Sequence, residues 1–155
     1  MTSVRLIDTS ILCELLEVPG KSSEIAAKKI KETFAQLVQD DVWFILPLAA
    51  VIETGNHIAQ NGDGVVRRNK GLLLKSFVER SMRQDSPFLK PPFWNSQDLE
   101  AWMKEFPDAA MRKVGLGDVS IMRDMEIAKE RLQLPSALSI EIWSKDTHLS
   151  RTVPR

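Results

Sequence analysis

The chain has 155 residues, of which 43% are hydrophobic and 27% are charged, values typical of a water-soluble globular protein. This length suits one domain with a proper core, so we expect a single domain over residues 1–155. The 21 lysines and arginines balance the 21 aspartates and glutamates. This balance excludes a protein whose overall charge alone would recruit nucleic acid or a membrane. Cys13 is the single cysteine, which excludes an internal disulfide. With no secretion signal and no apolar run of membrane-spanning length, we expect a cytoplasmic location.

The order of the predicted elements indicates an α/β fold. An apolar, β-branched segment at residues 4–7 predicts a first strand, which ends at the helix-capping sequence Asp8-Thr9-Ser10. The other predicted elements are helices over 11–18, 23–39, 48–60, 65–84, 97–105 and 117–132 and strands over 42–46 and 139–143. Strands that alternate with long helical crossovers are typical of a mainly parallel sheet.

Four acidic residues lie at the edges of these apolar segments: Asp8, Glu53, Asp118 and Asp146. In an open α/β sheet, binding sites form at the carboxyl ends of the strands, where side chains of this kind meet. Carboxylates gathered there would repel one another strongly unless a divalent cation neutralised them. Hard oxygen ligands suit Mg²⁺ or Mn²⁺. The pattern therefore predicts a metal site and an enzyme.

Each acid alone has a second interpretation. Asp8 and Asp118 both stand where a helix begins, and an aspartate there can simply cap the helix. Asp146 is also an ordinary residue for a turn after a strand. Glu53 lies among apolar neighbours, so its charge must either face a cleft or be paired. The joint placement of the four residues is what indicates a site.

The segments that carry these acids resemble the PIN-domain ribonucleases, a family that includes the toxins of VapBC-type toxin–antitoxin pairs. The resemblance runs from residue 4 to residue 149 and rests on four segments: LIDTSIL (6–12), LPLAAVIETGNHI (46–58), GLGDVSIMRDMEIA (115–128) and SIEIWSKDTHLS (139–150). It implies a PIN-like, three-layer α/β/α fold with a mainly parallel sheet. It also implies that Asp8, Glu53, Asp118 and Asp146 are the catalytic residues and the ligands of Mg²⁺ or Mn²⁺.

The function implied by the resemblance is a metal-dependent endoribonuclease that cleaves RNA phosphodiester bonds. A toxin of this kind would have an antitoxin protein as a partner and would form a homodimer. One alternative is a PIN-like module that binds RNA or a protein with weak or no nuclease activity. Another, a phosphatase of a different acidic α/β family, is disfavoured because such enzymes carry a DxD motif after the first strand, where this chain has Asp8-Thr9-Ser10.

Three further features have two interpretations each. Ser10 and Ser144 can hydrogen-bond the carboxylates or a substrate phosphate, or they can serve only as caps. The basic stretch at 65–83 can steer RNA toward the acids or form a solvated helix face. The aromatic side chains of the proline-rich loop 86–95 can stack on unpaired bases or cover the core.

Overall fold

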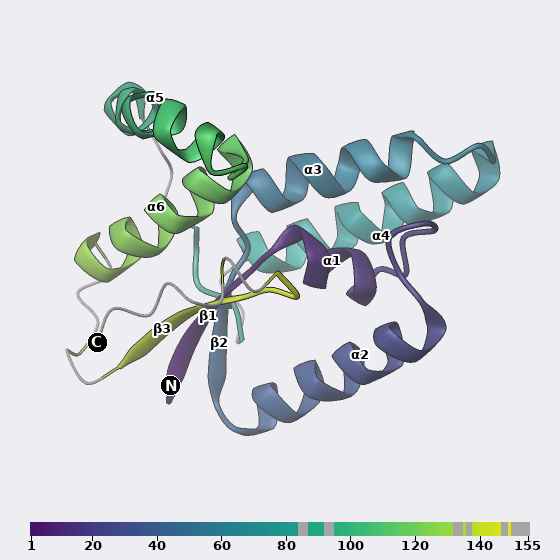
Figure 1. Ribbon diagram of the computed structural model, residues 1–155. Coiled ribbons are helices and arrows are strands. Elements are labelled where there is room, and N and C mark those ends of the chain that lie inside the picture. The colour runs from purple at the N-terminus through teal and green to yellow at the C-terminus, as the bar shows by residue number, and fades with distance from the viewer. Residues whose placement is uncertain (84–86, 92–94, 132–134, 136–137, 147–148, 150–155) are drawn as a thin grey trace.

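The computed structural model describes residues 1–83, 87–91, 95–131, 135, 138–146 and 149 (Figure 1). In these residues the elements, in chain order, are β1 (Ser3–Ile7), α1 (Thr9–Leu15), α2 (Glu24–Gln39), β2 (Val42–Ile45), α3 (Leu48–Ala59), α4 (Gly64–Met82), α5 (Ser96–Met111), α6 (Leu116–Arg131) and β3 (Ser139–Trp143). The predicted order is confirmed. No helix in the described part of the chain combines the length and the apolar character that crossing a bilayer requires.

The sheet places β1 at its centre, between β2 and β3, and all three strands run parallel. Val4 of β1 pairs with Trp43 of β2 on one side and with Ile140 of β3 on the other. The chain first steps from β1 to β2 and later crosses back over β1 to β3. A reversal of this kind opens a crevice at the carboxyl ends of the strands, beside the central strand.

Helices cover both faces of the sheet, so the predicted three-layer α/β/α arrangement is confirmed. On one face, α1, α2 and α4 pack around the fully buried Phe44 and Leu12. On the other face, α6 packs Ile121 and Met125 against β1 and β3. Figure 1 shows α2 and α6 on opposite sides of the strands, with α5 lying over α6 and α3 beside α4.

The predicted end of the fifth helix, at residue 105, is wrong, because α5 continues to Met111. Pro107 lies inside the helix and removes one backbone hydrogen bond. The turn that follows it buries Ala109 against Val119 of α6, in one cluster with Trp102. Burial of this apolar face offsets the lost hydrogen bond, so the helix runs past the proline.

Phe88 lies in the core, which excludes it from stacking on bases. Its segment pairs with the edge of β2: the Phe44 amide donates to the Pro87 carbonyl (2.8 Å) and the Leu89 amide donates to the Phe44 carbonyl (2.8 Å). The Phe88 ring, 2% exposed, meets the Phe77 ring edge-on at 5.5 Å and the Phe44 ring at 6.2 Å. The other aromatic residues of that loop, Phe93 and Trp94, lie outside the described residues.

We predict that Phe88→Ala lowers the free energy of unfolding by about 3–5 kcal/mol, because it leaves a cavity among packed aromatic rings. Urea denaturation measures the change. The control is Ile25→Ala, at a position 85% exposed on α2, which should change stability by less than about 0.5 kcal/mol. Equal effects of the two substitutions would contradict the core position of Phe88.

Candidate active site

The four predicted acids line one cleft at the carboxyl edge of the sheet. Asp8 follows β1 directly and caps the N-terminus of α1, while Glu53 lies in the second turn of α3. Asp118 lies in the first turn of α6, and Asp146 follows β3. The cleft that these side chains line has a volume of about 260 Å³. Strand ends and helix starts therefore bring together residues that are far apart in the sequence.

Asp8 is 5% exposed and is held by hydroxyl groups from both ends of the chain. Its Oδ2 accepts hydrogen bonds from Ser10 Oγ at 2.9 Å and from Ser144 Oγ at 2.7 Å. The backbone amide of Lys145 in turn donates to Ser10 Oγ at 2.9 Å, and that of Asp146 donates to Ser144 Oγ at 2.8 Å. Asp8 thus both caps α1 and anchors the segment after β3. Its second oxygen, Oδ1, has no hydrogen-bond partner among the described residues.

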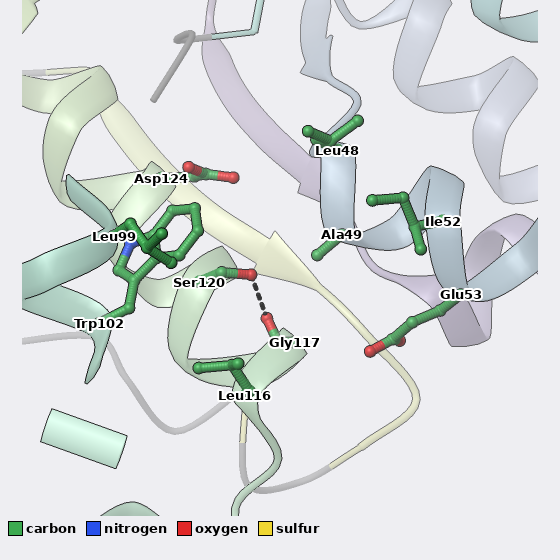
Figure 2. Close-up of a pocket in the computed structure, with 10 residues that line it drawn as sticks. All are labelled: Leu48, Ala49, Ile52, Glu53, Leu99, Trp102, Leu116, Gly117, Ser120 and Asp124. Carbon is green, nitrogen blue, oxygen red and sulfur yellow. Dashed lines mark hydrogen bonds between the residues drawn. The ribbon is translucent and has the colours of Figure 1, made fainter. Parts of the chain in front are cut away.

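Glu53 is positioned by one hydrogen bond and one close backbone approach. Thr9 Oγ1 donates to Glu53 Oε2 at 2.7 Å. The other oxygen, Oε1, lies so close to Gly117 of α6 that a Cβ atom at this glycine would be 2.0 Å from it. Figure 2 shows the Glu53 carboxyl group pointing toward this first turn of α6. A residue without a side chain at position 117 is therefore required if Glu53 is to keep this position.

The charges in the cleft act on one another. Burial is the largest cause that raises the pKa of Asp118, followed by the negative charges of Asp8, Glu53 and Asp146. A hydrogen bond with the Gly115 backbone acts in the opposite direction and lowers the pKa. In the described part of the chain, no three His, Cys, Asp or Glu side chains already form a group able to hold an ion. The four acids therefore line the same cleft and repel one another, but their carboxylate oxygens are not already arranged around one ion position. A divalent cation would relieve that repulsion, and carboxylate oxygens are the donors that Mg²⁺ and Mn²⁺ accept.

Basic and neutral side chains complete the cleft, with Lys21, His57, Cys13 and Lys145 among its lining. Burial raises the pKa of the Cys13 thiol, which is typical of a small core residue rather than a reactive thiol. Lys145 forms an ion pair with Glu14, a side chain only 1% exposed on α1. The sequence pattern did not predict this pair, although a glutamate within the apolar run ILCELL was a signal. His148, the other histidine, lies outside the described residues.

A second, mostly apolar cleft of about 320 Å³ adjoins the acids and shares Glu53 with them (Figure 2). It lies between α3, α5 and α6, and its other lining residues are Leu48, Ala49, Ile52, Leu99, Trp102, Leu116, Gly117, Ser120 and Asp124. Asp124 is 4% exposed, and its Oδ1 is buried without a hydrogen-bond partner among the described residues. Burial, followed by the charge of Asp98, raises the pKa of Asp124 to about 7. The sequence pattern did not indicate this acid.

Comparison with known proteins shows the fold alone. The sequence matches no protein family and no curated protein. The structure is similar to a chain in the crystal structure of VapBC2 from Rickettsia felis bound to a DNA fragment from their promoter. The TM-score is 0.50 at 12% identity, and the likeness covers 91% of this chain and 99% of that chain. The chain has a PIN-like fold. The structure of FitAcB from Neisseria gonorrhoeae gives a TM-score of 0.46 at 13% identity, over 92% of this chain and 88% of that chain.

The raised pKa of Asp124 predicts a pH-dependent stability. A carboxyl group with a pKa of about 7 in the folded protein and 3.8 as its ordinary value binds its proton more tightly when folded. The free energy of unfolding therefore falls as the pH rises from about 4 to about 7. The Asp124→Asn variant has no such group and therefore escapes this loss. The free energy of unfolding of the variant minus that of wild type should be roughly 2–4 kcal/mol larger at pH 8 than at pH 4.

Urea denaturation at the two pH values measures this difference. Asp108→Asn, the same chemical change at an exposed position of α5, is the matched control for the loss of one negative charge. A stability difference between Asp124→Asn and wild type that is constant over this pH range would refute the buried, protonated state of Asp124.

Proposed function

We propose that this protein is a metal-dependent endoribonuclease that hydrolyses RNA phosphodiester bonds and acts as the toxin of a toxin–antitoxin pair. The observation that carries the proposal is that four carboxylates line one cleft, where burial and then the charges of the other three raise the pKa of Asp118. A cation bound among them would relieve this repulsion. The likeness to a VapBC2 chain of similar length supports the proposal at the level of the fold.

The residues proposed to hold Mg²⁺ or Mn²⁺ are Asp8 through its Oδ1, Glu53 and Asp118, with Asp146 at the exposed side of the cleft. This donor set fits the ion because it is made of carboxylate oxygens, one of them without a hydrogen-bond partner among the described residues. A divalent cation bound there activates water and offsets the charge that develops on the phosphate.

The surrounding side chains orient the acids and receive the substrate. Ser10 and Ser144 fix one oxygen of Asp8 and leave the other available. Thr9 fixes Glu53 in the same way. Lys21 and His57 line the cleft and can donate hydrogen bonds to phosphate oxygens. These groups hold a bound phosphodiester beside the acids.

Three of the six basic side chains in the stretch 65–83 have contacts within the protein. Arg67 donates to the carbonyl of Asn61, Lys70 donates to the carbonyl of Leu16, and Lys75 pairs with Glu79. Of these contacts, only the Lys75–Glu79 ion pair offsets a positive charge. We infer that helix α4 stays positively charged and attracts RNA in a manner that depends on salt.

The proposed protein partners are an antitoxin and a second copy of the chain. Three large apolar side chains on α4 are between 47% and 69% exposed: Val65, Leu72 and Leu73. Apolar surface of this kind commonly marks a protein interface. The same observation favours the second candidate function, a PIN-like module that binds RNA or a protein without cleaving. The lack of a ready-made metal-binding group among the described side chains also favours it.

We predict that purified protein cleaves single-stranded RNA only with Mg²⁺ or Mn²⁺ and that Asp8→Asn abolishes cleavage. Asparagine keeps the size of the side chain but removes a charge that the cation needs. Because the substitution also relieves repulsion, the variant should be as stable as wild type or slightly more stable. Gel assays of RNA cleavage and thermal unfolding measure the two effects, with Asp108→Asn as the control at an exposed site.

Two outcomes would count against the proposal in different ways. Full metal-dependent cleavage by Asp8→Asn would show that the ligand assignment is wrong. A wild-type protein that binds RNA or a protein partner but cleaves no RNA would establish the binding module instead.

A second prediction tests the position of Glu53. Gly117→Ala adds a Cβ atom that would lie 2.0 Å from Glu53 Oε1, so the carboxylate must swing away. The end of this side chain is flexible, and alanine favours a helix over glycine, so stability should change by less than about 1 kcal/mol. The affinity for Mn²⁺, measured by calorimetry, should fall about tenfold or more, which corresponds to about 1.4 kcal/mol.

The matched control is Gly71→Ala on α4, where an added Cβ meets nothing within 4 Å. This variant should bind Mn²⁺ as wild type does. Equal Mn²⁺ affinity of both variants would show that Glu53 is not a ligand in the position described.

A further inference from the structure

The apolar cleft beside the acids is placed to receive part of the substrate. It shares Glu53 with the acidic cleft and continues from it between α3, α5 and α6 (Figure 2). When a phosphodiester lies among the acids, a neighbouring nucleotide is the part of the chain within reach of this second cleft. Leu48, Ile52 and Leu99 give it apolar walls that are 42%, 53% and 41% exposed.

Asp124 gives this apolar cleft one specific polar group. The side chain is 4% exposed and lines the cleft, and its Oδ1 is buried with no hydrogen-bond partner among the described residues. Buried polar atoms in folded proteins almost always have a partner, so an unsatisfied acceptor of this kind needs an explanation. A ligand that brings a hydrogen-bond donor into the cleft would satisfy it.

We propose that this cleft is a nucleobase subsite in which Asp124 accepts a hydrogen bond from the exocyclic amino group of guanine, adenine or cytosine. The inference rests on the proposed RNA cleavage and makes Asp124 a specificity-determining residue. Flat bases released from a stack commonly lie between apolar side chains while a polar group reads their edge. The cleft offers both parts of that arrangement.

The amino group is the feature that the cleft can distinguish. A carboxylate only accepts hydrogen bonds, so it suits the adjacent N1–H and amino group of guanine and the amino groups of adenine and cytosine. A protonated carboxyl group also donates, so it would pair with uracil as well. With a pKa of about 7, Asp124 is mostly ionised at about pH 8. Uracil presents a carbonyl oxygen on each side of its single N–H and offers no amino group. It is therefore the base that the subsite should reject when Asp124 is ionised.

A nucleobase fits the cleft better than an apolar side chain from a partner protein or a second copy. An apolar occupant would cover Asp124 and leave its Oδ1 without any donor, which is costly for a buried acceptor. The continuity with the acidic cleft through Glu53 also favours a group attached to the scissile phosphate.

The first test sequences the ends that the protein produces from a random pool of unstructured RNA with Mn²⁺. At about pH 8, where Asp124 is mostly ionised, wild type should disfavour uridine about tenfold relative to the other three bases at one position beside the cut. An asparagine can both donate and accept, so Asp124→Asn should accept uridine and lose most of this discrimination. Asp108→Asn, at an exposed position of α5, should keep it.

The second test measures binding without cleavage. Asp8→Asn protein without metal is titrated with GMP, AMP, CMP and UMP and followed by NMR, which also reports that the variants are folded. At about pH 8, the three nucleotides with amino groups should bind more tightly than UMP, and the added Asp124→Asn substitution should remove the difference.

The outcomes separate this inference from the proposed function. RNA cleavage with the same base preference in wild type and Asp124→Asn would overturn the subsite and leave the ribonuclease standing. Base-selective binding that depends on Asp124, in a protein that cleaves no RNA, would support the subsite and overturn the nuclease. If Asp124→Asn changes the oligomeric state or the binding of a protein partner but leaves the base preference unchanged, the cleft is a protein interface. That result would overturn the inference.

Discussion

Carboxylates from four separate segments lie at one edge of the parallel sheet and repel one another there. β1 and β3 end side by side, and α3 and α6 bring two further acids to the same edge. The groups that position these acids are mostly neutral: Ser10 and Ser144 at Asp8, and Thr9 at Glu53. Two cations, Lys21 and Lys145, also line the cleft, and Lys145 is paired with Glu14. The groups that hydrogen-bond the acids therefore orient the carboxylates without neutralising them.

Helix α6 connects the core, the acids and the second cleft. Its first turn carries Asp118 and the glycine that lets Glu53 approach. Ile121 and Met125 of the same helix pack on the sheet, which fixes how far that turn reaches into the cleft. Asp124 lies between these two core residues in sequence but lines the apolar cleft toward α5. A shift of α6 would therefore change the core, the acids and the proposed base subsite together.

The sequence predicted what depends on local patterns. The order of the elements and the bounds of β3 follow from short apolar segments and capping residues, and the meeting of the four acids follows from the topology of a parallel sheet. The contacts it could not predict join residues that are distant in the chain, and apart from the glutamate within the apolar run ILCELL they carry no local signal. These are the approach of Gly117 to Glu53, the pair of Lys145 with Glu14 and the burial of Asp124. The continuation of α5 past Pro107 likewise depends on packing against α6.

The most direct test of the central claim is the thermal unfolding of the protein in increasing concentrations of MnCl₂. Binding to the folded state alone adds about 2.7 kcal/mol of stability at a ligand concentration one hundred times Kd. We expect the midpoint temperature of wild type to rise steadily with Mn²⁺, and that of Glu53→Gln to stay nearly constant. Glu32→Gln, on the exposed face of α2, should behave like wild type. A wild-type midpoint that does not change with Mn²⁺, or an equal rise in Glu53→Gln, would contradict the account.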